Sequence, residues 1–372
     1  SKEKKGTLLW VLDKTKTAMG GRMLRSWLEK PLLDAAEITR RHGAVEELVD
    51  SVIIRGELEE ALRDVTDLER VMTRIVTGTV NCRDLLGLAR GLRALPQVKQ
   101  VLSGTESPML QKLAASIDPL EGCADRIENT IVDEPPLTIR EGGIIRPGAD
   151  QQADFLRSLM QGGADTILTI EAQEREKTGI RTLKVSYNKV FGYYIEVSKS
   201  FIDQVPDRFV RKQTLANCER YITQELKEME ATIFSADEKL VSLEYDIFTS
   251  LRNFVVENQE RIRNAASLVA EIDVYRSLAD VASKNNYVCP EVDLSTEIVI
   301  KDGRHPVVER FATDSYFVPN DTTLDTSSNK IMIITGPNMA GKSTYMRQVA
   351  LITVMAQIGC FVPASSAILP VT

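Results

Sequence analysis

Residues 222–254 read ITQELKEMEATIFSADEKLVSLEYDIFTSLRNF. Apolar side chains recur there in steps of four and three: Ile222, Leu226, Met229, Ile233, Ala236, Leu240, Leu243, Ile247, Leu251 and Phe254. This seam predicts one long helix packed against a second helix, as in a coiled coil. At 1.5 Å per residue the helix would be roughly 50 Å long, well beyond a typical globular helix. The spacing predicts a partner helix and, by itself, no chemistry.

The partner helix and a β segment lie just upstream. A helical pattern begins at about Asp150, runs to Lys177 and is ended by Thr178-Gly179, where glycine supplies the positive φ of a helix end. Residues 182–198 alternate apolar and polar side chains on both sides of Phe191-Gly192, which predicts a hairpin. The sequence therefore predicts a two-helix stalk with a small β insert.

The flanking segments predict a helical core and the opening of an α/β unit. Apolar residues at three- and four-residue spacing run from Gly6 to about Leu120, and Pro- and Gly-rich sequence makes an irregular connection over 134–148. Short strands begin at about Ile298. A further predicted strand, residues 331–335, runs into a glycine-rich turn and a long apolar helix, the order in which an α/β nucleotide domain opens.

Composition and charge exclude several function classes. The net charge is −7, so no global field draws the chain to DNA or to an anionic membrane, and any nucleic-acid contact must be local. The five cysteines are scattered, and His42 and His305 are interpreted as packed or hydrogen-bonded, not as metal ligands or catalytic groups. No apolar run approaches the ~18 residues of a membrane span, and no signal core follows the N-terminus. We expect a soluble protein of the reduced cytoplasm with no membrane partner.

Residues 336–343, GPNMAGKS, fit the phosphate-binding pattern G-x-x-x-x-G-K-[ST]. The glycines let successive N–H groups face phosphate oxygens, and the helix that begins near Lys342 adds its positive dipole end. Lys342 is expected to reach the β and γ phosphates of ATP or ADP, and the Ser343 hydroxyl to bind Mg²⁺. The bare pattern arises by accident in on the order of one per cent of chains of this length, which makes a purely structural turn a weak alternative.

Hydrolysis at such a site also requires a carboxylate from a later strand to hold Mg²⁺ and a group that orients the attacking water. The sequence ends at Thr372, before any such strand. No catalytic set is complete in the chain. We therefore expect the chain alone to bind nucleotide weakly and to hydrolyse it poorly or not at all.

The β insert is locally basic. Residues 181–212 carry a charge of +4, from seven basic and three acidic side chains. The basic side chains are Arg181, Lys184, Lys189, Lys199, Arg208, Arg211 and Lys212. Basic groups interleaved with aromatic ones suit contact with a nucleic-acid backbone. A solvated face over a β core, with the aromatic side chains inside, explains the same charge equally well.

Residues 335–348, TGPNMAGKSTYMRQ, resemble the P-loop of the MutS family of DNA mismatch-repair ATPases, which the Pro-Asn-Met insert distinguishes from other P-loops. GRHPVV (303–308) and FVPND (317–321) are similar to the start of the same ATPase domain. The resemblance implies that Phe317 stacks on the adenine with Val318 beside it. It also implies phosphate binding by Gly336, Pro337, Asn338, Met339, Ala340, Gly341, Lys342, Ser343 and Thr344. Ala340 stands where many relatives carry glycine, at a position that the motif leaves free.

The β insert and the N-terminal region resemble the same family. GYYIEV (192–197) and RKQTLANCERYI (211–222) are similar to the clamp of bacterial members, and TLLWVLD (7–13) and MGGRML (19–24) to the core domain. The resemblance implies DNA-backbone contacts from Lys189, Arg211, Lys212 and Asn217. It implies a parent protein that is a homodimer, encircles mismatched double-stranded DNA, uses ATP to become a sliding clamp and recruits MutL.

The expected fold is multidomain and mainly α, with a small β clamp insert and the start of an α/β P-loop ATPase domain. We expect a helical core domain at 1–149, long lever helices at 150–180 and 219–285, the β-rich DNA clamp at 181–218, and the N-terminal part of the ATPase domain at 286–372. The family's mispair-reading domain, connector, Mg²⁺-binding carboxylate strand and dimerisation helices have no match in the chain. Mismatch reading is therefore not expected of this chain alone.

Three other functions stay open. A chromosome-organising coiled-coil ATPase would have a longer heptad run and a P-loop near its N-terminus, whereas the loop here follows the stalk. A pure DNA-binding module with a vestigial nucleotide strand would bind DNA with no effect of nucleotide. A MutS paralogue that acts in recombination would lack the clamp sequence of residues 182–222.

Overall fold

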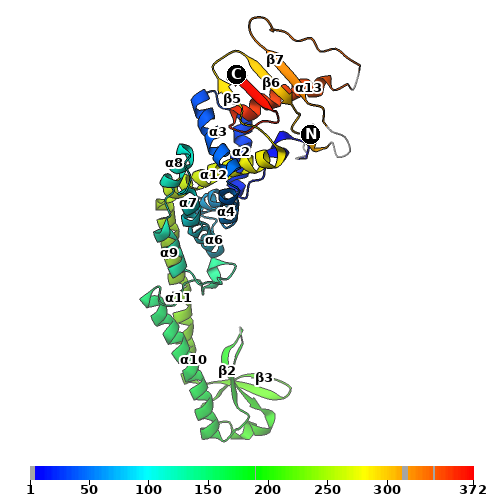
Figure 1. The fold of residues 1–372 in the computed structure, drawn as a ribbon. Helices are drawn as coiled ribbons and strands as arrows, with labels where there is room; N and C mark the ends of the chain where they lie inside the picture. Colours follow the sequence, from blue (N-terminus) through cyan, green and yellow to red (C-terminus); the bar gives the residue numbers. More distant parts are fainter. Residues whose placement is uncertain (1–4, 189, 312–316, 338–339) are drawn as a thin grey trace. The chain divides into compact units, whose positions relative to one another are not determined.

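The computed structural model describes residues 5–188, 190–311, 317–337 and 340–372. Contacts divide the chain into two compact units (Figure 1). The first contains Ser1–Val80, Asp84–Asp125 and Val255–Thr372, and the second contains Asn81–Arg83 and Arg126–Phe254. The expectation of a mainly helical fold with small sheets is confirmed.

The first unit is built around helix α12 (Gln259–Asn285). Every residue of α12 from Ile272 to Ala282 is buried, so the helix is covered on all sides. It contacts α2, α3, α4 and α5 among others. The helices that precede residue 131 are α1 (Leu8–Leu12), α2 (Ala18–Glu29), α3 (Ala35–Asp50), α4 (Val52–Arg63), α5 (Leu68–Val76), α6 (Cys82–Arg93), α7 (Leu95–Leu102), α8 (Pro108–Ser116) and α9 (Glu121–Thr130).

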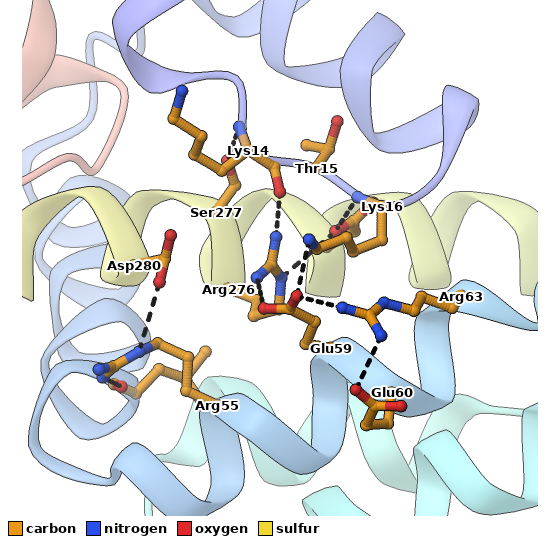
Figure 2. A network of polar contacts seen from close by, with 12 residues as sticks. Lys14, Thr15, Lys16, Arg55, Glu59, Glu60, Arg63, Arg276, Ser277 and Asp280 are labelled. Carbon is orange, nitrogen blue, oxygen red and sulfur yellow. Dashed lines mark hydrogen bonds and ion pairs between the residues drawn. The ribbon is translucent and has the colours of Figure 1, made fainter. Parts of the chain in front are cut away.

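Buried polar side chains of α12 hold the segment between α1 and α2. The Asp273 carboxylate accepts hydrogen bonds from the backbone N–H groups of Lys16 (2.9 Å) and Thr17 (2.7 Å), and from the Thr17 hydroxyl (2.8 Å). Arg276 pairs with Glu59 at 3.0 Å, and Lys16 Nζ reaches the same carboxylate at 2.7 Å (Figure 2). Charges this deeply buried are stable only when they are paired.

The first unit also contains a four-stranded sheet in the order β5-β8-β6-β7. Its strands are β5 (Glu291–Asp293), β6 (Ile298–Gly303), β7 (Asn320–Leu324) and β8 (Ser366–Pro370). β6 runs antiparallel to β7 and β8, and β5 runs parallel to β8. Helix α13 (Lys342–Gln357) is tied to this sheet because the Tyr345 hydroxyl hydrogen-bonds to the Thr322 hydroxyl of β7 at 2.7 Å. The predicted strand near Ile298 and the helix start near Lys342 are confirmed.

The C-terminal end of α13 is held by residues of the helical part of the first unit. The carbonyl oxygen of Ala356 accepts a hydrogen bond from Nε2 of His42 at 3.0 Å. The Gln357 side-chain amide donates to the Leu32 carbonyl oxygen at 2.9 Å, and Leu32 N–H donates back to the Gln357 carbonyl at 3.2 Å. His42 is therefore a packed, hydrogen-bonded side chain, as predicted, and burial lowers its pKa to about 4.

The second unit consists of two long helices and a small sheet. Helix α10 (Gln151–Thr178) ends at Gly179, whose φ of 72° is left-handed, and α11 (Gln224–Glu257) is a single helix of 34 residues. The two helices pack through Ala153 and Leu156 of α10 against Ala236 and Leu240 of α11. Close approach continues at Gly163, where a Cβ would stand 2.6 Å from Ile233 Cγ1. The predicted stalk of paired helices is confirmed.

The sheet of the second unit lies between α10 and α11 in the sequence and has the order β1-β2-β4-β3. Its strands are β1 (Lys184–Asn188), β2 (Gly192–Ser198), β3 (Val210–Thr214) and β4 (Cys218–Ile222), all antiparallel to their neighbours. The side chains of Leu183, Ile195 and Val197 form its buried core, together with Leu226 of α11. The hairpin predicted over 182–198 is confirmed, with Tyr187 opposite Tyr193.

The prediction of a strand at residues 331–335 is wrong. These residues have no regular structure, and Ile331 and Ile333 are each 84% exposed. A strand is stable only where its N–H and C=O groups pair with a neighbouring strand. No described strand pairs with this segment. The apolar residues of this segment favour a strand, but a strand forms only when another segment of the chain pairs with it.

The range 219–285, predicted to be helical, begins inside β4, which ends at Ile222. Two helices follow, separated by Asn258, since α11 ends at Glu257 and α12 begins at Gln259. α12 contacts the helices of the first unit. The four-part domain division stays a prediction. In the part of the chain that the structure describes, no helix is long and apolar enough to cross a membrane.

We expect the His42 contact to make stability depend on pH. Because the pKa of His42 is lower in the folded state than its ordinary value of 6.5, the stability that its neutral imidazole contributes is complete above pH 6.5 and is lost as the pH falls toward 4. Between pH 7 and pH 5 the free energy of unfolding should fall by about 2 kcal/mol more than in His42→Gln, which cannot titrate. Urea unfolding of both proteins at the two pH values measures this. Equal losses would show that His42 does not titrate on unfolding.

Candidate functional site

The glycine-rich loop before α13 leaves the helix N-terminus open. Gly336 has φ 152° and Gly341 φ 84°, and Gly341 is the N-cap of α13 with no side-chain capping bond. The first backbone bond of the helix runs from Tyr345 N–H to the Gly341 carbonyl at 2.9 Å. The N–H groups of the preceding turn, at Lys342, Ser343 and Thr344, have no partner within the helix. Such an end binds anions through free donors and the helix dipole.

Lys342 lies over the loop, with its amine donating to the carbonyl oxygens of Gly336 and, at 2.9 Å, Pro337. Its ammonium therefore lies against the loop that leads into α13. A positive charge beside free donors fits an anionic group such as a phosphate. Ser343 is exposed at the helix start. The predicted residues Asn338 and Met339 lie outside the described residues.

A cavity of about 790 Å³ joins this loop to the residues predicted to hold a base. Ala340, Gly341, Lys342 and Thr344 line one part of it. The other lining residues are Val308, Phe317, Val318, Asn320, Asp321, Met332, Ile333, Ile334, Thr335, Tyr345 and Gln348. A single cavity thus contains cationic and N–H groups for phosphates together with an aromatic and an aliphatic side chain for a base. Its size and mixed lining suit a small-molecule ligand.

The donors of the loop fit a polyphosphate better than they fit a metal ion. The Ser343 hydroxyl is available as an Mg²⁺ ligand. Among the described residues, no group of three or more His, Cys, Asp or Glu side chains is placed to hold a metal. The lining carboxylate, Asp321, already accepts from the Asp302 N–H at 2.9 Å and pairs with Lys301 at 3.1 Å. Backbone N–H and salt contacts lower the pKa of Asp321, so it stays charged and occupied.

Gln348 is a lining residue that the sequence analysis missed. Its side chain is fully buried, and neither Oε1 nor Nε2 has a hydrogen-bond partner among the described residues. Its position continues the buried stripe of α13 that includes Ile352 and Met355. A glutamine at an apolar position of an amphipathic helix was the available signal.

The β insert holds three of the four predicted DNA contacts on one hairpin, β3–β4. Arg211 is 64% exposed in its side chain and lies 3.5 Å from the Glu219 carboxylate. Lys212 is exposed at an irregularity where the register shifts between Arg211 and Gln213. Asn217 is exposed in the turn. A bulge re-aims side chains at a strand edge, which accounts for the exposure of Arg211 and Lys212. Lys189, the fourth predicted contact, lies outside the described residues.

Glu219 organises the base of this hairpin. Its buried carboxylate accepts from the Tyr221 hydroxyl at 2.5 Å and from the Thr214 hydroxyl at 3.3 Å, besides facing Arg211. These contacts lower the pKa of Glu219, the Tyr221 hydrogen bond most of all. The carboxylate therefore stays ionised and fixes the side of the sheet on which Arg211 emerges.

Two basic side chains of the β insert form ion pairs within the second unit. Arg208 pairs with the buried Glu174 of α10. Arg220 pairs with Glu196 at 3.2 Å and lies over the Tyr194 ring at 4.3 Å. Arg181, Lys184 and Lys199 remain exposed, like Lys212. The aromatic side chains divide similarly: Tyr194 and Tyr221 are buried, whereas Tyr187 and Phe191 are each 46% exposed. The exposed basic surface of the insert thus has fewer unneutralised charges than the seven basic side chains of residues 181–212 indicate.

Comparisons with known proteins relate the chain to one family. A family model described as MutS domain III matches residues 1–279, and another described as MutS domain V matches residues 332–372. The chain is 53% identical over 366 residues to the DNA mismatch repair protein MutS of Ruminiclostridium cellulolyticum, and 52% identical over 366 residues to that of Acetivibrio thermocellus. Each alignment covers 98% of this chain and 42% of the relative, so the chain spans about two fifths of the length of these relatives.

The hairpin turn at Gly192 provides a test of how the sheet packs on α11. Gly192 has φ 74°, and an added Cβ would stand 1.8 Å from Oε1 of Glu230. Gly192→Ala should destabilise the β1–β2 hairpin by about 1–2 kcal/mol, because a left-handed backbone is costly for alanine. Amide hydrogen exchange in β1 and β2 should then be roughly fivefold to thirtyfold faster.

Two further variants separate the collision with Glu230 from the cost of the left-handed backbone. Gly192→Ala with Glu230→Ala relieves the collision but not the backbone cost, so exchange should recover only in part. Gly162→Ala, at a helical site with open space around the added Cβ, should not accelerate exchange. Unchanged exchange in Gly192→Ala would contradict the described turn.

Proposed function

This chain belongs to the MutS family, and from that premise we propose that it is the part of a DNA mismatch-repair ATPase that binds ATP with Mg²⁺ and contacts the DNA backbone. The relatives named as DNA mismatch repair proteins are more than twice as long as the alignment. The proposal therefore concerns the role of this part within a longer activity. The observation that carries it is the cavity lined by both Phe317 and the loop that precedes α13.

In the proposed nucleotide site, different residues would bind the phosphates, the adenine and Mg²⁺. The N–H groups at the start of α13 and the Lys342 ammonium would bind the β and γ phosphates, and Thr344 lies in the same lining. Phe317 would stack on the adenine, with Val318 against its edge. Bound Mg²⁺ supplies charge neutralisation at the phosphates, and the Ser343 hydroxyl would be one of its ligands. Lys342 would have to leave the carbonyls of Gly336 and Pro337 when phosphate replaces them.

Hydrolysis requires groups that the described residues do not bring to the cavity. Asp321 is paired with Lys301, and no other carboxylate lines the described part of the cavity. Water activation and a second Mg²⁺ ligand would have to come from elsewhere. We propose that this chain contributes nucleotide binding to the ATPase of the parent, and little turnover by itself.

In the proposed clamp, Arg211, Lys212 and Asn217 would contact phosphates of double-stranded DNA. Lysine and arginine contacts of this kind fix position without reading sequence. The buried Glu219 holds the hairpin from which they project. We further propose the family's wider assembly for the parent: a homodimer around mismatched DNA, a nucleotide-dependent sliding clamp, recruitment of MutL, and a place in the cytoplasm.

Replacing Lys342 tests the nucleotide site. Lys342→Ala removes the cation from the phosphate end, so the affinity for MgATP should fall by about tenfold or more, as expected for loss of a hydrogen bond to a charged group. Isothermal titration measures the change. Lys330→Ala removes an exposed lysine that does not line the cavity and should leave the affinity unchanged. MgATP binding that is equally strong in Lys342→Ala would refute the phosphate assignment.

The clamp assignment predicts a salt-dependent loss of DNA binding. If Arg211 and Lys212 each contact a phosphate, changing both to Ala should reduce the slope of log K against log salt by about 1.8. Binding to a duplex across a salt series measures the slope. The control is Arg90→Ala with Lys112→Ala, which removes two exposed positive charges from the helices α6 and α8. Equal slopes in the two double variants would mean that only net charge matters. DNA binding with no response to nucleotide would favour a simple DNA-binding module.

A further inference from the structure

The register of the second unit's sheet gives the β insert two opposite ends. β2 and β4 run antiparallel, with Ser198 opposite Cys218. The turn from β1 into β2, which ends at Gly192, therefore lies at one end of the sheet. The turn from β3 into β4, which contains Asn217, lies at the other end. Asn217, one of the proposed DNA contacts, thus marks one particular end of the insert.

The end with the β1–β2 turn does not suit a DNA backbone. Val190 and Phe191 in this turn are 80% and 46% exposed, so the surface that they offer is apolar. Glu230 of α11 lies beside Gly192, because a Cβ added to that glycine would stand 1.8 Å from the Glu230 Oε1 atom. A carboxylate repels a phosphate, and an apolar surface offers it no donor.

The end with the β3–β4 turn carries exposed cations. Lys199 follows Ser198 directly, and its backbone N–H donates to the Asn217 carbonyl oxygen at 3.1 Å. On the other side of β2, the hydroxyls of Ser198 and Thr182 lie 3.4 Å apart, and Arg181 directly precedes Thr182. The side chains of Arg181 and Lys199 are exposed. Because neighbouring strands are about 4.8 Å apart, Arg181, Lys199 and Asn217 form a row roughly 10 Å long.

The carboxylates of β2 and β4 are engaged by other groups. Glu196 of β2 has Lys184 opposite it on β1 and pairs with Arg220 of β4 at 3.2 Å. Glu219 of β4 is buried and accepts hydrogen bonds from two hydroxyls. Neither carboxylate is therefore available to neutralise the two cations of the row. An exposed cation without a fixed partner can bind a phosphate at little cost to the fold.

We propose that Arg181 and Lys199 are further phosphate-binding residues, and that the insert meets the DNA backbone with the end of the sheet that carries Asn217. The inference rests on the proposed clamp function, to which it adds two residues and an orientation. Arg181 would bind a phosphate through its planar guanidinium and Lys199 through a point charge. With Arg211 and Lys212 they form a surface that holds the backbone of double-stranded DNA without reading its sequence.

The test is duplex binding across a salt series by the unchanged chain and by Arg181→Ala with Lys199→Ala. Each phosphate contact contributes about 0.9 to the slope of log K against log salt, so the slope should fall by about 1.8. Arg181→Lys with Lys199→Arg keeps both charges and should keep the slope. The matched control, Lys227→Ala with Lys239→Ala, removes two exposed lysines from α11 and should also leave the slope unchanged.

The outcomes separate this inference from the clamp function. An unchanged slope in Arg181→Ala with Lys199→Ala, while Arg211→Ala with Lys212→Ala lowers it, would overturn the inference and leave the clamp function standing. An equal fall in the α11 control would mean that only net charge matters, and an equal fall in the charge-keeping variant that the sheet is disturbed. Either result also overturns the inference. If the unchanged chain binds no duplex at low salt, the proposed clamp function fails, and the inference fails with it.

Discussion

The placement of α13 is the constraint on which the proposed nucleotide site depends. A helix leaves carbonyl groups unpaired at its C-terminal end and N–H groups unpaired at its N-terminal end. In this chain the carbonyl end is satisfied by protein groups, with His42 on Ala356 and Leu32 on Gln357. The N-terminal end is capped by Gly341, which has no side chain to offer. The helix is thus fixed at one end and open to an anion at the other.

The groups that fix α13 belong to the core around α12. Asp273 and Arg276 on α12 hold the segment that leads into α2. The contacts to the end of α13 come from His42 of α3 and from Leu32, in the link between α2 and α3. Beyond Asn285 the chain continues into the sheet, where Arg304 donates to the Asn285 carbonyl oxygen at 3.0 Å. Hydrogen bonds therefore join the helical part of the first unit to the C-terminal end of α13 and to Arg304, which follows β6. Burying a charged side chain costs free energy unless the charge is paired. The contacts of Asp273 therefore hold the segment between α1 and α2 on one face of α12.

The sequence predicted what depends on local periodicity. The seam from Leu226 to Phe254 identified α11, although Ile222, its first predicted member, lies in β4. Gly179 marked the end of α10 because the positive φ that it adopts favours glycine. The strand predicted at residues 331–335 was wrong for the opposite reason, because a strand must pair with segments that lie far away in the chain. Helical spacing places Gln348 on the buried face of α13, but whether its amide finds a partner depends on segments far away in the chain, so the sequence did not identify it. The phosphate loop itself was recognisable because its chemistry resides in contiguous residues.

The basic β insert shows why a charge count overstates an interaction surface. Arg208 lies in the segment of high positive charge, residues 181–212, but the buried Glu174 pairs with it. Arg220, which follows that segment, is paired with Glu196 in the same way. Such pairs are local and persist when distant charges are screened by salt. Arg211 differs because its partner is shared: Glu219 also accepts from Tyr221 and Thr214, and its contact with Arg211 is long at 3.5 Å. A carboxylate already satisfied by two hydroxyls competes weakly for an exposed guanidinium. Arg211 and the exposed Lys212 beside it are consequently the cations of this hairpin that a phosphate could recruit without breaking the sheet.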